Sequence, residues 1–177
     1  MKMDIVASSG NDEFYTPLYA IEPIKKYIKI GGASIWCPFD TKDSLFVKEL
    51  GKTNKVIVTH IKDGYDFFNY EPSEHYDYII SNPPYSCKGE VFERLFKLDK
   101  PFAMLVGVVG IFESQKRFEM FRDNEFEIMY FNKRISYFKN YEDQKPSLNP
   151  PFGSVYICHR MLPKTIMFEE VNKNYKL

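Results

Sequence analysis

The stretch YDYIISNPPYS, residues 76–86, joins an apolar strand-like run to a turn that a strand cannot continue. The two adjacent prolines have no backbone N–H to donate to a neighbouring strand. Proline also restricts the residue before it to extended conformations, so the turn holds Asn82 and Tyr85 at set angles beyond the strand end. The sequence therefore predicts a buried strand that ends in a stiff turn carrying an amide and an aromatic ring.

Similar apolar runs recur along the chain with helical patterns between them, which is typical of a parallel sheet with crossover helices. Six runs have the composition of strands: 34–37, 55–59, 76–81, 102–106, 127–131 and 154–159. Four segments have helical patterns: 17–29, 44–50, 89–97 and 114–121. The last two strand-like runs have no helical segment between them, so we expect them to be antiparallel to each other in a mixed α/β sheet.

The length of 177 residues suits one domain with a substantial core, and we expect a single domain over residues 1–177. Lysine plus arginine and aspartate plus glutamate balance at 24 each, so the total charge does not indicate nucleic-acid binding. The sequence has no long apolar run and no signal-peptide pattern, which predicts a cytoplasmic protein that does not enter a membrane. Three widely separated cysteines predict free thiols rather than disulfides or a metal site: Cys37, Cys87 and Cys158.

Ligands of open α/β sheets bind beyond the carboxyl ends of the strands. Three of the expected strand ends carry polar or aromatic residues: the turn 37–40 after the first strand, His60 after the second, and the turn 82–85 after the third. Because the carboxyl ends of parallel strands lie at one edge of a sheet, the sequence predicts that these residues form one site.

The Asn-Pro-Pro-Tyr turn at residues 82–85, which ends an apolar strand in a chain with this strand pattern, resembles the signature of S-adenosylmethionine-dependent methyltransferases that act on planar amino groups. The closest likeness is to small phage-type adenine-N6 methyltransferases. The resemblance implies a Rossmann-like fold in one domain, with a mostly parallel seven-stranded sheet whose last strand is antiparallel. Members of the family that read a DNA sequence usually carry a separate recognition region, and because this chain has no room for one beyond its loops, we expect no separate target-recognition domain.

In that family the asparagine side chain and the next backbone carbonyl accept hydrogen bonds from the target amine, while the aromatic ring stacks on the base. The resemblance thus gives the catalytic roles to Asn82, Pro83, Pro84 and Tyr85. The chemistry suits these groups, because two acceptors can hold a conjugated amine toward a tetrahedral geometry in which it becomes a better nucleophile. The alternative is that the prolines only end the strand.

Two other segments resemble parts of the family's cofactor site. Residues 13–17 are similar to the segment that contacts the methionine end of S-adenosylmethionine, with Tyr15, Thr16 and Pro17 as candidates, although Thr16 is equally suited to cap a helix. The first strand turn keeps the family's Pro-Phe but lacks its glycines, which normally let the backbone approach the cofactor. Either a carboxylate of this loop meets the cofactor's amine, or the cofactor binds weakly. The candidates are Cys37, Pro38, Phe39 and Asp40.

The turns after the second strand complete the implied cofactor site. The family usually presents an acidic residue to the ribose, where this chain has His60, which could instead be a surface residue. Asp66 followed by Phe67 fits the loop that accepts a hydrogen bond from the cofactor's adenine and packs on its ring. We expect one of Phe67 and Phe68 to lie in the core.

The segment after residue 131 resembles the basic and aromatic part of the family that holds an extruded base. It offers Lys133 and Arg134 for phosphate binding, and Tyr137 and Phe138 for stacking. We expect no regular structure from there to residue 153, and a stretch of that length is usually functional or mobile. The second Asn-Pro-Pro-Phe, at 149–152, precedes its strand, and we interpret it as a turn leading into that strand.

The resemblance implies methyl transfer from S-adenosylmethionine to the N6 amine of adenine in nucleic acid, with DNA favoured over RNA. A duplex substrate would need base flipping. A second hypothesis is a protein-glutamine methyltransferase, in which the same turn holds a side-chain amide. A third is a methyltransferase fold that has lost catalysis and only binds nucleic acid, which the missing glycines suggest. A partner subunit could supply recognition of the target sequence.

Overall fold

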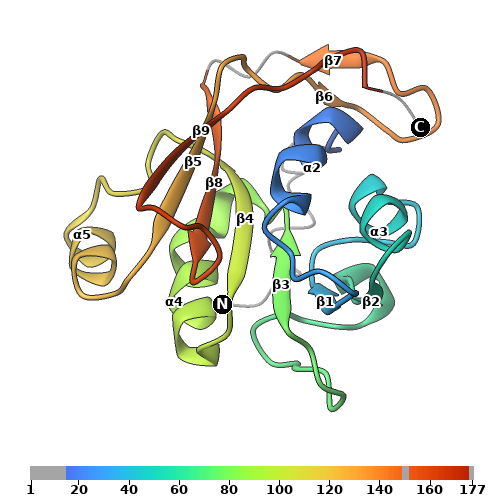
Figure 1. The fold of residues 1–177 in the computed structure, drawn as a ribbon. Helices are drawn as coiled ribbons and strands as arrows, with labels where there is room; N and C mark the ends of the chain where they lie inside the picture. The colour runs from blue at the N-terminus through green and yellow to red at the C-terminus, as the bar shows by residue number, and fades with distance from the viewer. Residues whose placement is uncertain (1–14, 149–151, 176–177) are drawn as a thin grey trace.

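A seven-stranded sheet runs through the middle of the molecule (Figure 1). The computed structural model describes residues 15–148 and 152–175. In spatial order the strands are β2 (Lys55–Val58), β1 (Ser34–Cys37), β3 (Tyr78–Ser81), β4 (Phe102–Gly107), β8 (Ser154–His159), β5 (Glu127–Phe131) and β9 (Ile166–Glu169).

The strands β2, β1, β3 and β4 are parallel neighbours, whereas β8 is antiparallel to both β4 and β5. These pairings confirm the predicted mostly parallel sheet of seven strands with an inserted antiparallel strand, although this strand, β8, is not the last one in the chain, contrary to the prediction. The chain continues beyond β8 to β9, which pairs in parallel with β5. This strand was not among the six expected runs, because its apolar part is only Ile166 to Phe168, shorter than the usual strand signal.

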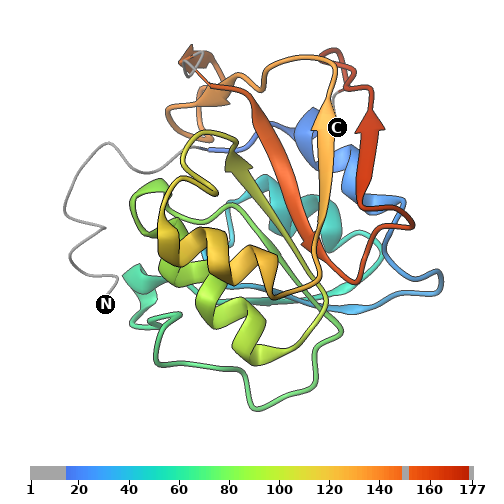
Figure 2. The same cartoon turned by 90° about the vertical axis from the view of Figure 1, so that its left-hand side faces the viewer.

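Helices cover both faces of the sheet (Figure 1). On one face lie α2 (Leu18–Lys25) and α3 (Leu45–Leu50), and on the other lie α4 (Lys88–Leu98) and α5 (Gln115–Arg122), which Figure 2 shows side by side. All four are within the predicted segments or one residue beyond them, except that α2 ends four residues early. Its last turn tightens, because the N–H groups of Tyr27 and Ile28 bond to carbonyls three residues back, and the chain then turns at Gly31 and Gly32 with φ of 93° at both.

Alternate residues of each strand point to opposite faces, so the core has two layers. On the α2 and α3 face, strand residues such as Ile35 and Ile80 pack with Phe46. On the α4 and α5 face, Trp36 and Ile79 pack with residues of those helices. The two layers bury all three cysteines, which are free thiols as predicted, and burial raises the pKa of Cys37 and of Cys158.

The segment 132–148 contains a short hairpin, which corrects the expectation of no regular structure. Strand β6 (Tyr137–Phe138) pairs antiparallel with β7 (Pro146–Leu148). The hairpin also joins the N-terminal segment, because the Phe138 N–H donates to the Tyr15 carbonyl at 2.9 Å and the Tyr15 N–H donates to the Phe138 carbonyl at 3.4 Å. Within the two described ranges, no helix is long and apolar enough to cross a bilayer.

Candidate active site

The turn of residues 82–85, called here the Asn82 turn, leaves the carboxyl end of β3 and leads through a single 3₁₀ turn (Tyr85–Cys87) into α4. The side-chain amide of Asn82 donates from Nδ2 to Thr16 Oγ1 at 3.1 Å. Thr16 is 1% exposed. The structure therefore brings together two segments with separate predicted roles, one in catalysis and the other in cofactor binding. The capping interpretation of Thr16 is wrong, because Pro17 occupies the N-cap position of α2.

Asp40 connects the first strand turn to the base of the Asn82 turn. Its Oδ2 accepts a hydrogen bond from Ser81 Oγ and its Oδ1 accepts one from Ser44 Oγ, each at 2.5 Å. Ser44 is also the N-cap of α3, where its Oγ accepts from the Phe46 N–H at 3.2 Å. The residues that replace the family's glycines thus build a loop held by hydroxyl–carboxylate bonds. Contact between Asp40 and a cofactor amine stays a prediction.

Burial of Asp40 has a consequence for stability. Loss of solvent raises its carboxyl pKa from 3.8 to about 6, against the opposing effect of the two serine hydrogen bonds. A raised folded-state pKa means that the folded protein binds this proton more tightly than the unfolded chain does. The associated stabilisation is complete below the unfolded pKa and is lost as the pH rises through 6.

We therefore expect Asp40→Asn to remove part of the pH dependence of stability. For the wild type, this group should lower the free energy of unfolding by roughly 3 kcal/mol between about pH 4 and pH 7, since one pKa unit corresponds to about 1.4 kcal/mol. Urea unfolding across that range measures the difference between variant and wild type. Asp43→Asn, at an exposed site in the same loop, is the control. Parallel curves for wild type and Asp40→Asn would contradict the assignment.

The aromatic ring of the Asn82 turn packs against Phe152, which is not among the predicted site residues. The centroids of Tyr85 and Phe152 are 5.3 Å apart, and Lys88 Nζ lies 5.7 Å from the Tyr85 centroid. Both rings lie over Gly107 at the end of β4. A Cβ atom there would come within 2.6 Å of two Phe152 ring carbons and 3.2 Å of Tyr85 Cε1. The repeated Asn-Pro-Pro-aromatic pattern was the available signal for Phe152. Asn149 to Pro151 lie outside the described residues, as do Glu13 and Phe14.

The candidates of the first two cofactor turns are mostly buried. Cys37 and Pro38 are buried, and Phe39 is half-buried with its ring 4.8 Å from Phe67. Phe67 is 2% exposed and lies 5.5 Å from Trp36, which confirms that one of the two phenylalanines belongs to the core. Its ring therefore has no open face for the cofactor's adenine, and this prediction is corrected. Phe68 is the more exposed of the pair.

His60 and Asp66 both hold turns at this edge of the sheet. His60 is 9% exposed, so it is not a surface residue, and its Nδ1 accepts from the Lys62 N–H at 3.1 Å. The carboxylate of Asp66 accepts from the Phe68 N–H at 2.9 Å and from Asn69 Nδ2 at 3.1 Å. These bonds shape the turns, and binding of a cofactor by either residue stays a prediction.

The predicted substrate residues separate into surface and core positions. Lys133 and Arg134 are exposed in the turn after β5, and Phe138 is half-buried in the hairpin. Tyr137 is 0% exposed, its hydroxyl lies 2.7 Å from Ser154 Oγ, and burial raises its pKa to about 12. A fully enclosed ring has no face for a base, so the prediction that Tyr137 stacks on the substrate is corrected.

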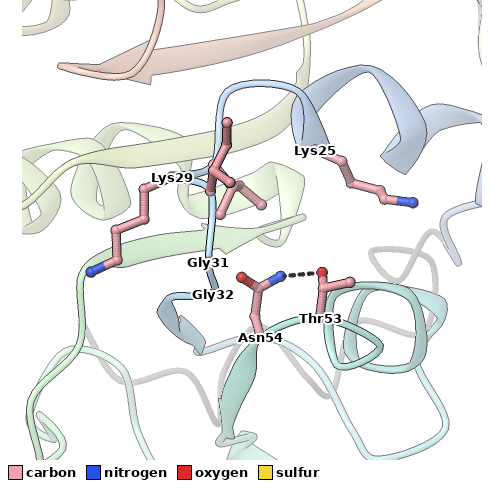
Figure 3. A pocket seen from close by; sticks show the side chains of 8 residues that line it. Lys25, Lys29, Gly31, Gly32, Thr53 and Asn54 are labelled. Carbon is pink, nitrogen blue, oxygen red and sulfur yellow. Dashed lines mark hydrogen bonds between the residues drawn. The ribbon is translucent and has the colours of Figure 1, made fainter.

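One surface pocket lies at the other end of the sheet, where β1 and β2 begin (Figure 3). It encloses about 230 Å³ and is lined by Lys25, Ile28, Lys29, Ile30, Gly31, Gly32, Thr53 and Asn54. Its two lysines are already paired, Lys25 with Glu49 at 2.5 Å and Lys29 with Asp77 at 2.7 Å. Because the pocket lies where β1 and β2 begin, and the Asn82 turn lies where β3 ends, the two are separate and we assign the pocket no part in the site.

Comparison with known proteins identifies the class of fold. A modification subunit assigned to a type I restriction enzyme from Vibrio vulnificus YJ016 has a similar structure, with a TM-score of 0.56 and 13% sequence identity. The match covers 96% of this chain and 50% of that protein, so the chain spans about half of its length. No family model and no curated protein sequence matches this chain. The sheet order and this likeness together show the Rossmann-like mixed α/β fold that the sequence predicted.

Proposed function

We propose that this protein transfers a methyl group from S-adenosylmethionine to the exocyclic N6 amine of adenine in nucleic acid, with DNA as the favoured substrate. The observation that carries the proposal is the Asn82 amide, held by Thr16 at the carboxyl end of β3 in the turn that also carries Tyr85. The fold supports methyl transfer. The neighbour's description as a restriction-enzyme modification subunit supports a nucleic-acid substrate, and its being a subunit supports a partner that reads the target sequence.

The groups at this edge of the sheet fit the cofactor's chemistry. S-Adenosylmethionine presents an ammonium group, ribose hydroxyls and an adenine amine, all of which donate hydrogen bonds, and it supplies an electrophilic methyl group when bound. The strand turns here offer acceptors in the carboxylates of Asp40 and Asp66. His60, whose Nδ1 already accepts from the Lys62 N–H, would donate from Nε2 to a ribose oxygen. Tyr15, Thr16 and Pro17 would lie along its methionine end, and Cys37, Pro38, Phe39 and Phe67 would shape the walls behind it.

The Asn82 turn would act on the target amine. The side-chain oxygen of Asn82 and the carbonyl oxygen of Pro83 would accept hydrogen bonds from the two N–H groups of the target amine. This arrangement directs the nitrogen lone pair out of the plane of the adenine ring. Pro84 fixes the direction of the turn, and the Tyr85 ring stacks on the base, with Phe138 as a second stacking surface. Lys133 and Arg134 bind phosphates outside the site. No strong base is needed, because the nitrogen loses its proton once the new N–C bond has formed.

The experiment that tests the function supplies the purified protein with donor labelled in the methyl group and with separate pools of DNA, RNA and protein. Label in digested nucleic acid that co-migrates with N6-methyladenine is the expected result, and the pool that carries it names the polymer. Label in protein alone would favour the glutamine hypothesis. An absence of label together with an absence of donor binding would favour a fold that has lost catalysis.

Thr16 gives a separate test of how the Asn82 amide is oriented. Thr16→Val keeps the shape of this buried side chain but removes the hydroxyl that accepts from Asn82 Nδ2. A net hydrogen bond contributes about 1 kcal/mol, so we expect kcat to fall roughly 5-fold. Thr16→Ser retains the hydroxyl and serves as the matched control. Equal kcat values for the valine and serine variants at saturating donor would show that this bond does not orient the amide.

A further inference from the structure

Strand β9 forms the outer edge of the sheet next to β5, and no further strand follows it within the described residues. Two carbonyls of this segment point toward β5 and accept hydrogen bonds there. The Thr165 carbonyl accepts from the Ile128 N–H at 2.7 Å, and the Glu169 carbonyl accepts from the N–H of Asn132, just after β5, at 3.2 Å. Backbone groups alternate between the two sides of a strand. The N–H and C=O groups of Ile166 and Phe168 therefore point away from β5, to the open edge.

The same two residues expose large apolar side chains on one face of the sheet. Ile166 is 51% exposed and Phe168 is 79% exposed. The Phe168 ring is stacked on Tyr130 of β5, with centroids 5.9 Å apart and an angle of 26° between the rings. On the opposite face Glu169 is bound by Lys26 Nζ at 2.6 Å and by Tyr27 Oη at 2.5 Å. The edge is thus a fixed, apolar template for another strand.

The sequence of this edge is complementary to itself. Residues 164–170 read KTIMFEE, with Met167 at the centre. When two copies run antiparallel about Met167, Ile166 of one copy faces Phe168 of the other, and Lys164 faces Glu170. Ile166 and Phe168 lie on one face of β9, because side chains alternate with period two, and pairing that extends two residues beyond either side of them would bring the flanking Lys164 and Glu170 to the same face.

We propose that β9 pairs with β9 of a second copy of this chain, antiparallel and centred on Met167, so that the two sheets become one. The outward groups agree with this register, since Ile166 and the facing Phe168 then exchange both backbone hydrogen bonds. Centring the pairing on Ile166 or on Phe168 still aligns the residues whose backbone groups point outward. The first of these registers places Lys164 opposite Phe168, and the second places Ile166 opposite Glu170. Only the register centred on Met167 pairs apolar with apolar and positive with negative side chains.

Charge reversal tests this register directly. Lys164→Glu and Glu170→Lys each place like charges opposite each other at both ends of the paired strands, because the symmetric interface repeats every contact. We expect each single variant to raise the dimer dissociation constant roughly 10-fold or more, and the double reversal to restore it. Lys48→Glu, at an exposed position of α3, is the matched control and should dimerise like the wild type.

Sedimentation over a wide range of protein concentration gives the mass and the dissociation constant. The wild type should be a dimer, and Phe168→Glu, at a site exposed enough to leave folding intact, should be a monomer with an unchanged circular dichroism spectrum. A monomeric wild type at every concentration, a dimeric Phe168→Glu, or a double reversal that fails to restore the dimer would each overturn the proposal. None of these measurements uses donor or nucleic acid, so their outcome is independent of the proposed function.

Discussion

Replacing Asn82 with alanine is expected to lower kcat for methyl transfer by roughly 100-fold or more, with little change in affinity for S-adenosylmethionine. The amide oxygen gains most of its value as charge develops on the amine nitrogen, so its loss affects the transition state more than the bound ground state. The amide is held by Thr16 and is part of a turn stiffened by two prolines. Its removal should therefore leave the surrounding backbone in place.

Single-turnover rates at saturating donor, together with a donor binding titration, separate these two effects. Asn174→Ala, which removes an exposed asparagine near the C-terminal end of the described residues, is the matched control. An Asn82→Ala protein that keeps its rate would remove the central residue of the proposed mechanism. If affinity for the donor fell by the same factor as the rate, Asn82 would contact the cofactor rather than the target amine.

Gly107→Ala is expected to lower kcat roughly 10-fold or more and to destabilise the fold by about 1–3 kcal/mol, the usual cost of overpacking. The added methyl group would lie 2.6 Å from two ring carbons of Phe152, and 3.2 Å from the Tyr85 ring. Backbone movement cannot relieve the contact easily, because Gly107 is paired with Ser154 in the centre of the sheet. Both rings must shift, which moves the Tyr85 ring that is proposed to stack on the target base.

Gly153→Ala provides the control, because a Cβ atom there meets nothing within 4 Å. Thermal unfolding and initial rates should place this variant close to the wild type. In a Phe152→Leu background the Gly107→Ala change should cost much less stability, since the shorter side chain leaves room. An equal cost in both backgrounds would show that the clash with Phe152 is not the cause.

The sequence predicted the parts of the site that depend on local chemistry. Proline geometry located the Asn82 turn at the end of β3, and the apolar runs located the strands that position it. The joining of Thr16 to Asn82, by contrast, spans 66 residues and depends on how α2 packs on the sheet. Local pattern carries no information about such a contact.

The corrections have a common physical origin. Phe67 and Tyr137 are aromatic residues in segments that match a binding role, but the packing of the surrounding core decides which ring of a pair remains accessible. Sequence alone assigned Phe67 to the cofactor, although Phe68 is the ring that stays partly exposed. Likewise β9 has too few apolar residues for a strand signal, and it forms because β5 offers a parallel edge.

The hairpin of β6 and β7 separates the part of the chain that must stay constant from the part that can change. Its base is fixed by the pairing of Phe138 with Tyr15, next to Thr16, whereas residues 142–145 at its tip are exposed. Lengthening an exposed loop costs little, since closure entropy grows only slowly with loop length. Evolution or protein engineering can therefore enlarge this tip into a longer arm without rebuilding the sheet that carries the chemistry.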